Sequence, residues 1–152
     1  IIDACARRGD PEGASLLLKE MAEQAVAPDV ASFTAVISSF ARKSDADSAV
    51  DTFKRMTASG KQPDVVAMNA VLDGLAKAGN FNGAMQWLNE MEEVDLSPTV
   101  VSYTSVVSGC ARRGDVAGAT EAFRAMLDAG ITPDLFGYNA MIKCCPTAGD
   151  VE

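Results

Sequence analysis

Apolar residues recur along the chain in steps of three and four, the spacing of one face of an α-helix. One such series consists of Tyr103, Val106, Val107, Cys110 and Ala111. A second series follows at Ala119, Ala122, Phe123 and Met126. Gly114 lies between them, where it can adopt the left-handed conformation that ends a helix, and Asp115 can cap the next helix. The pattern therefore predicts two helices joined by a short turn.

This two-helix pattern repeats with a period of 35 residues. Four series keep the step: Pro28, Pro63, Pro98 and Pro133; Met21, Met56, Met91 and Met126; Ala14, Ala49, Ala84 and Ala119; and Gly9, Gly79, Gly114 and Gly149, with Ser44 in the gap. Four independent series with one period are strong evidence of internal repeats. We expect one array over 1–152, with complete repeats at 30–64, 65–99 (the middle repeat) and 100–134, and partial repeats at 1–29 and 135–152.

A single helical hairpin cannot bury its apolar face alone, whereas a stack of hairpins buries a continuous core. We therefore predict an all-α fold, an α-solenoid of stacked antiparallel helical hairpins. The sequence begins at Ile1 and stops inside a repeat. We accordingly expect a fragment of a longer protein whose two exposed ends fray.

The composition argues against catalysis and against a metal site. The chain contains no histidine, the commonest general base and metal ligand. Its four cysteines lack CxxC spacing, and Cys5, Cys110 and Cys145 share a repeat position with Phe40 and Leu75, which indicates core packing. We expect no enzymatic activity, cofactor, metal or small-molecule substrate. No run of 18 apolar residues is present, so we expect no membrane span.

The net charge of −8 and the pI near 4.5 argue, taken alone, against a nucleic-acid partner. The expected first helices of the hairpins are 1–8, 31–43, 66–78, 101–113 and 136–148. They contain eight of the 13 basic residues but only two of the 21 acidic ones. The sequence therefore predicts a basic first-helix layer, with the acidity on the second helices and the links.

Several phrases resemble the P-type pentatricopeptide repeat, a family of organellar RNA-binding proteins. They are VVSYT at 100–104, SGCARRGD at 108–115, AFRAM at 122–126 and GITPD at 130–134. The resemblance implies a right-handed superhelix whose first helices bind single-stranded RNA, one base per repeat, with the RNA 5′ end toward the N-terminus. It also implies a location in the mitochondrion or chloroplast, a role in RNA processing, stability or translation, and other RNA-processing proteins as further partners.

In this family the fifth and last residues of a repeat together read one base. The resemblance thus pairs Thr34 with Asp64, Asn69 with Thr99, and Thr104 with Asp134. Asp29 and Asn139 belong to incomplete units. The pairs imply guanine at the first and third complete repeats and a pyrimidine at the middle repeat, with uracil and cytosine both open. The plainer interpretation is that these residues cap helices, and the two roles are compatible.

The resemblance assigns two further roles. The second residue of each repeat would hold the base between apolar side chains, at Ala31, Val66, Val101 and Phe136. A basic column at Arg7, Arg42, Lys77 and Arg112 would contact phosphates, and Thr147 interrupts it. The alternative for the column is the preference of basic side chains for the last turn of a helix. With about four phosphate contacts, binding should be weak and sensitive to salt.

Two other functions fit the same architecture. A helical-hairpin solenoid can be a protein interaction scaffold, and it can also be the recognition arm of an RNA nuclease or editing factor. Other conspicuous residues have structural interpretations. Trp87 should be a packing residue rather than a stacking platform for a nucleic acid. Glu90, Glu92 and Glu93 should form a solvated face, and Pro146 should kink or end the last helix.

Overall fold

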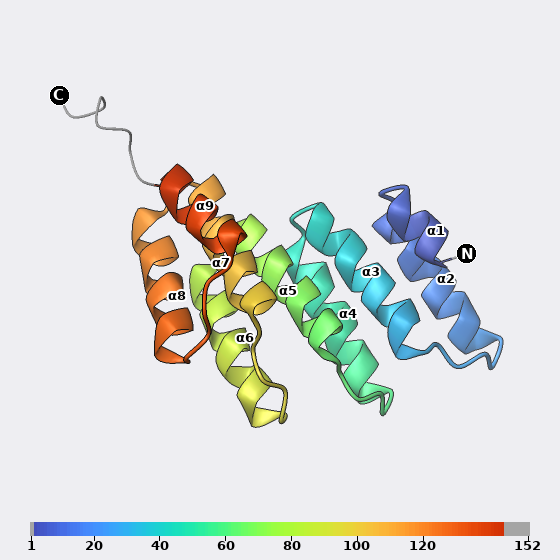
Figure 1. Cartoon of the computed structure of the whole chain (residues 1–152). Coiled ribbons are helices and arrows are strands. Elements are labelled where there is room, and N and C mark those ends of the chain that lie inside the picture. Colours follow the sequence, from blue (N-terminus) through green and yellow to red (C-terminus); the bar gives the residue numbers. More distant parts are fainter. Residues whose placement is uncertain (1, 145–152) are drawn as a thin grey trace.

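Pairs of α-helices make up all the regular structure of residues 2–144, the range that the computed structural model describes (Figure 1). The first helices of the pairs are α1 (Ile2–Arg7), α3 (Val30–Arg42), α5 (Val65–Ala78), α7 (Val100–Arg112) and α9 (Leu135–Cys144). The second helices are α2 (Pro11–Glu23), α4 (Ala46–Ala58), α6 (Phe81–Glu93) and α8 (Val116–Asp128). None of these helices is long and apolar enough to cross a membrane. The predictions for Cys145, Pro146, Thr147 and Gly149 lie outside the described range.

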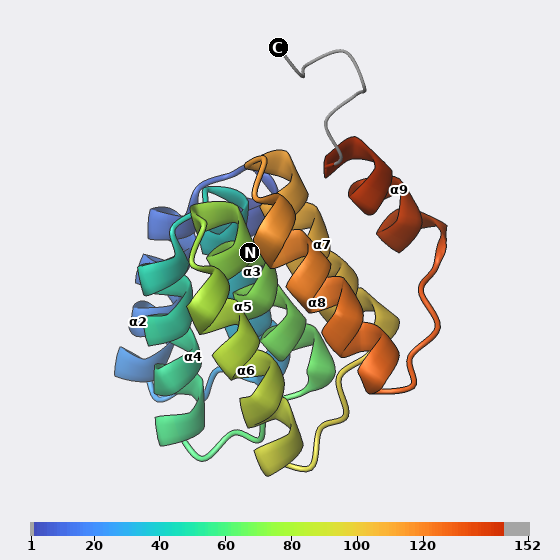
Figure 2. The same cartoon turned by 90° about the vertical axis from the view of Figure 1, so that its left-hand side faces the viewer.

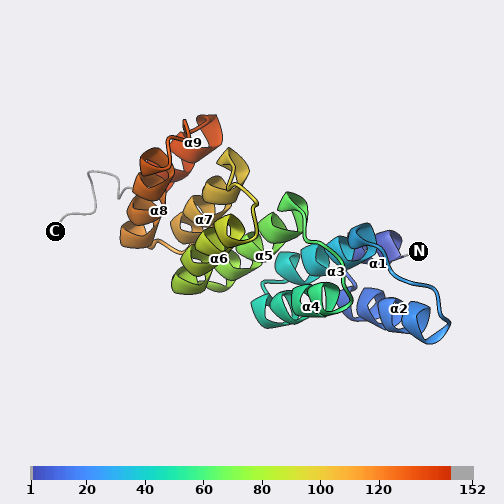
Figure 3. The ribbon, with the colours of Figure 1, turned by 90° about the horizontal axis from the view of Figure 1, so that it is seen from below.

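The helices form two layers (Figure 3). The first helices pack side by side in one layer, each against the first helix of the next repeat. The second helices form the other layer, and each packs between the first helix of its own repeat and that of the next. Figure 2 views the stack from its C-terminal end, where α9 is the last described helix of the first layer. The predicted all-α solenoid of stacked hairpins is therefore confirmed.

The turn inside each hairpin contains one residue with a left-handed backbone. Gly9, Gly79 and Gly114 have φ angles of 76°, 82° and 71°. Ser44 fills the gap in this glycine series and adopts the same conformation, with φ 59°. Glycine adopts positive φ at little cost because it has no Cβ. The predicted ends of the first helices at these positions are confirmed.

The core is built from positions that recur in every repeat. Ala14, Ala49, Ala84 and Ala119 are fully buried in the second helices, as are Met56, Met91 and Met126. The position that holds cysteine in some repeats also lies in the core: Phe40, Leu75 and Cys110 are buried, and Cys5 is half-buried in the short helix α1. The interpretation of this position as core packing is confirmed for the described residues.

Neighbouring first helices approach closely where their facing residues are small. A Cβ added at Gly109 of α7 would lie 2.3 Å from the Cβ of Ala76 in α5. One added at Gly74 of α5 would lie 3.2 Å from the Cβ of Ala41 in α3. Backbone therefore meets side chain directly between successive repeats, and the spacing of the first layer is set by these small residues.

Trp87 packs between the second helices, as expected. Its indole ring meets the Phe53 ring edge to face, with centroids 4.8 Å apart and an interplanar angle of 87°. This geometry is favourable for two aromatic rings. The contact joins α4 to α6 and keeps Trp87 out of the first-helix layer.

Candidate nucleic-acid interface

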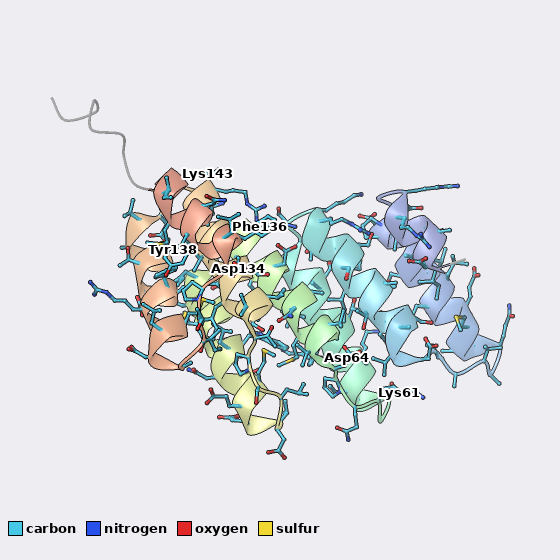
Figure 4. All side chains as sticks on the ribbon, in the orientation of Figure 1. Lys61, Asp64, Asp134, Phe136, Tyr138 and Lys143 are labelled. Atoms are coloured by element: carbon cyan, nitrogen blue, oxygen red, sulfur yellow. The ribbon has the colours of Figure 1, made fainter. Side chains whose placement is uncertain are left out.

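The last residue of each repeat caps the first helix of the next. Oδ1 of Asp29, Asp64 and Asp134 accepts the backbone N–H of the third residue that follows, at 2.8, 2.8 and 2.9 Å. Thr99 caps α7 in the same way, with its Oγ1 3.4 Å from the Ser102 nitrogen. Figure 4 labels Asp64 and Asp134 at the starts of α5 and α9. The predicted capping is confirmed for the last residues, whereas the fifth residues Thr34, Asn69 and Thr104 do not cap a helix. Oδ2 of Asp64 and of Asp134 has no hydrogen bond within residues 2–144.

The cap at Asp29 is the most strongly hydrogen-bonded of the set. Its Oδ1 accepts both the Ser32 hydroxyl, at 2.7 Å, and the Ser32 backbone N–H. These two bonds lower the pKa of Asp29 below its ordinary value. The carboxylate therefore carries its full negative charge at neutral pH.

Thr34 and Thr104, the fifth residues of two complete repeats, are half-buried between neighbouring first helices. The Thr34 hydroxyl donates to the Val30 carbonyl oxygen of its own helix, at 2.8 Å. The Thr104 hydroxyl is covered and has no hydrogen-bond partner within the described residues. Gly137 of α9 lies over it, since a Cβ added there would be 3.7 Å from Thr104 Oγ1.

The two asparagines at the fifth position differ in their surroundings. Asn69 is half-buried, and its Oδ1 accepts the Ser102 hydroxyl of the next first helix at 2.6 Å. Asn139 is exposed on α9, the last helix of the described range. Only Asn69 is therefore held by a neighbouring repeat.

The second residues of the repeats form an exposed apolar row along the first-helix layer. Val66, Val101 and Phe136 are 62%, 59% and 76% exposed, and Ala31 is also exposed. They occupy the same position in successive first helices, one turn before the fifth residues. Figure 4 shows Phe136 close to Asp134 at the start of α9. An exposed apolar row in register with the repeat is a surface on which a ligand with flat apolar faces can pack.

An open groove at repeat 30–64 brings the predicted residue types together. It has a volume of about 580 Å³ and runs across α1, α3 and the start of α5. Its lining includes the fifth and last residues Thr34 and Asp64, the second residues Ala31 and Val66, and the basic residues Arg7 and Arg42. Polar, apolar and cationic groups thus converge on one site between two repeats.

The two basic residues at the N-terminal end of the column make bonds within the protein. Arg7 pairs with Asp3 one turn earlier in α1. Arg42 crosses to the preceding repeat, and its Nη2 donates to the Ala6 carbonyl oxygen at 2.5 Å. The Arg42 contact is of the type expected from a cation at a helix C-terminus. It also keeps the charge of Arg42 at the edge of the groove.

Asp73 lies between the other two basic residues of the column. Lys77 pairs with Asp73 within α5, and Arg112 Nη2 of α7 lies 3.9 Å from Asp73 Oδ1. One carboxylate therefore offsets part of the charge of two cations. Asp73 is one of the two acidic residues in the expected first helices, and no role was predicted for it. Its spacing of four residues before Lys77 was the available signal.

Cys110 illustrates the chemistry of the core position. Burial, with smaller contributions from Asp115 and Cys144, raises the pKa of the Cys110 thiol from 9.0 to about 11. The thiolate is the reactive form of cysteine. A thiol with this pKa stays protonated in the folded chain at neutral pH.

We therefore expect Cys110 to react with iodoacetamide much more slowly than the half-buried Cys5 at about pH 8. Peptide mapping by mass spectrometry after timed labelling measures both rates. In urea the two residues should react alike, which provides the control. Equal rates in the folded protein would contradict the burial of Cys110.

The sequence matches two families that describe one kind of repeat. It matches the PPR repeat family over residues 63–112 and 98–146. It matches the pentatricopeptide repeat domain over residues 1–43 and 16–66. Together these matches cover residues 1–146. A comparison with curated proteins finds no match.

Several solved structures share the fold. The pentatricopeptide repeat protein PPR10 from maize superposes with a TM-score of 0.83 at 32% identity, covering 95% of this chain and 21% of PPR10. PPR10 in complex with an 18-nucleotide psaJ RNA element gives 0.82 at 24% identity, covering 93% and 21%. The PPR domain of Arabidopsis thaliana protein-only RNase P 1, in complex with tRNA, gives 0.74 at 21% identity, covering 94% and 76%. The chain thus spans about a fifth of the length of PPR10.

Proposed function

Because the chain belongs to the pentatricopeptide repeat family, we propose that it binds single-stranded RNA along its first-helix layer, one base per repeat. The observation that carries this proposal is the groove of repeat 30–64, where the six residues expected to hold one nucleotide line a single site. The RNA-bound structure of PPR10, which has the same fold, adds support. In this proposal the chain is a binding module, and no catalytic step is assigned to it.

Guanine is the base expected at repeats 30–64 and 100–134. Its Watson–Crick edge presents the N1–H and N2–H donors, and Oδ2 of Asp64 or Asp134 can accept them while Oδ1 continues to cap the helix. Thr34 and Thr104 would contribute a hydroxyl at the same edge. Thr34 must first turn about χ1 away from the Val30 carbonyl oxygen, a change between two rotamers that are both populated by threonine in helices.

The other contacts follow the layer. The exposed Val66 would cover one face of a base, and Val101 of the following repeat would cover its other face. Each base is then held between neighbouring repeats. Arg42, Lys77 and Arg112 would contact phosphates along the edge of the groove. Asn69 and Thr99 present an amide and a hydroxyl, which suit a pyrimidine at the middle repeat.

The proposal predicts base-specific binding of short RNAs. Fluorescence anisotropy at low salt should show RNAs containing G-U-G or G-C-G binding at least about tenfold more tightly than A-A-A, since a well-placed hydrogen-bonded base contact is worth about 1–3 kcal/mol. The DNA versions should bind more weakly than the RNAs. Equal affinity for G-U-G, A-A-A and the DNA would contradict one-base-per-repeat recognition.

Charge reversal locates the surface involved. Changing Arg42, Lys77 and Arg112 to glutamate should abolish RNA binding at low salt. The matched control changes Lys54, Arg55 and Arg124 to glutamate. These residues lie on the second helices α4 and α8, so the control should retain RNA binding. If groove reversal leaves RNA retention unchanged while a protein partner still binds, the chain is a protein interaction scaffold instead.

The role of the longer protein is proposed on the family resemblance alone. We propose that it acts on transcripts in mitochondria or chloroplasts, in RNA processing, stability or translation, together with other RNA-processing proteins. Imaging a fluorescently tagged full-length protein tests the location, and a signal confined to the cytosol would contradict it.

A further inference from the structure

A chain of hydrogen bonds joins the two residues expected to read the base of the middle repeat. The backbone N–H of Thr99 donates to Ser102 Oγ at 2.9 Å, and the Ser102 hydroxyl lies 2.6 Å from Asn69 Oδ1. Ser102 is the third residue of the following repeat and is fully buried. The equivalent residues of the two neighbouring repeats are Ala67 and Gly137, which have no hydroxyl. The bridge is therefore a property of the middle repeat.

The hydrogen bond from Ser102 determines which way the Asn69 amide faces. A serine hydroxyl has one proton to donate and two lone pairs that accept. Ser102 donates its one proton to Asn69 Oδ1 at 2.6 Å, a bond that only the amide oxygen can accept. The Ser102 oxygen accepts the Thr99 backbone N–H, and its second lone pair is left for the Thr99 hydroxyl, 3.2 Å away.

The amino group of Asn69 is consequently the part of the side chain that remains for a ligand. Within the described residues Nδ2 forms no hydrogen bond, and it is not sealed from solvent. Thr99 is fixed from the other side, because its Oγ1 caps α7 while its N–H is held by Ser102. Both residues of the pair are therefore oriented before any ligand arrives.

We infer that Ser102 is a positioning residue that selects cytosine over uracil at the middle repeat, an inference that rests on the proposed function. At the centre of its Watson–Crick edge cytosine presents N3, an acceptor to which the Asn69 amino group can donate. Uracil carries a proton on N3, so that two donors would meet. Without Ser102 the amide can turn over and present its oxygen to uracil N3–H, and the two pyrimidines would then be accepted about equally.

The Ser102→Ala variant tests this role directly. Wild type should bind an RNA containing G-C-G about tenfold more tightly than one containing G-U-G, the order expected for one mismatched hydrogen bond to a base edge. In Ser102→Ala the ratio should fall to about two or less, since the amide is no longer held. The variant should fold, because alanine already occupies this position in the neighbouring repeat. There the backbone N–H of Ala67 is capped by Asp64 at 2.8 Å.

Ser32→Ala is the matched control, since it removes a hydroxyl from the same repeat position in α3, where that hydroxyl donates to Asp29 rather than to a fifth residue. The cytosine-to-uracil ratio of this variant should equal that of wild type. A second measurement does not require RNA. In the free protein, the NMR signals of the Asn69 side-chain amide should shift in Ser102→Ala and stay in place in Ser32→Ala.

The outcomes separate this inference from the proposed function. Absence of RNA binding by wild type would overturn the proposed function, and the selection of cytosine with it. Tight RNA binding with an unchanged cytosine-to-uracil ratio in Ser102→Ala would overturn only the role of Ser102. Unchanged Asn69 amide signals in that variant would show that the bridge does not form and would overturn the role as well.

Discussion

Replacing Gly109 by alanine should lower the free energy of unfolding by about 2 kcal/mol, the cost of overpacking a close contact. The added Cβ would lie 2.3 Å from the Cβ of Ala76 and 2.8 Å from its carbonyl carbon. Because one of these atoms is backbone, α5 and α7 would have to move apart. The helix preference of alanine over glycine, about 1 kcal/mol, opposes the loss only in part. Circular dichroism should show a Tm lower by about 4–8 °C.

Gly137→Ala is the matched control for this prediction. It makes the same exchange inside a first helix, but the nearest atoms to its added Cβ lie at 3.6 Å, an ordinary contact distance. This variant should be neutral or more stable by about 0.5–1 kcal/mol, owing to helix preference. Equal effects of the two substitutions would mean that successive first helices are not in close contact at Gly109.

Replacing Asp73 by serine should strengthen RNA binding about five- to tenfold at low salt, because the substitution removes a negative charge from beside the two proposed phosphate contacts Lys77 and Arg112. Lys77 and Arg112 would lose the carboxylate that now lies between them. Serine is the residue that the neighbouring repeats carry at this position, as Ser38 and Ser108, so the fold should accept it. Fluorescence anisotropy over a range of salt concentrations would measure the gain, which should shrink as salt is added.

The control for Asp73→Ser is Asp51→Ser, which changes the net charge equally on the exposed face of α4. A local effect requires Asp51→Ser to leave the affinity almost unchanged. Equal gains in the two variants would indicate that only the total charge matters. No gain in Asp73→Ser would show that Lys77 and Arg112 do not contact phosphates.

Much of the fold could be predicted because the constrained positions recur with the period. Gly79 and Gly114 marked the ends of first helices, and Ser44 took the same left-handed conformation where the series had a gap. The backbone conformation of the links between hairpins was harder to predict. Ala25 and Asp95 also have positive φ, at 57° and 58°, but neither residue type signals this conformation as glycine does. Repeat register, rather than residue type, was the signal there.

The candidate site was predictable as a set of positions but not as a set of contacts. The sequence placed Asn69 and Asp73 in the first-helix layer correctly. It could not show that each is held by the following repeat, Asn69 by Ser102 and Asp73 by Arg112. These partners are 33 and 39 residues apart. Their contact depends on how far one hairpin is rotated against the next, and no local pattern records that angle.

The capping role of the last residues limits how recognition can change in evolution or by design. Asp64, Thr99 and Asp134 each start a helix as well as belonging to a proposed base-reading pair. Replacing a capping residue by alanine typically costs about 1 kcal/mol. Substitution at these positions is therefore confined to the few side chains that begin helices well, chiefly aspartate, asparagine, serine and threonine. A repeat can exchange one base preference for another among these four residue types. Any other residue at this position would destabilise the scaffold that presents the neighbouring sites.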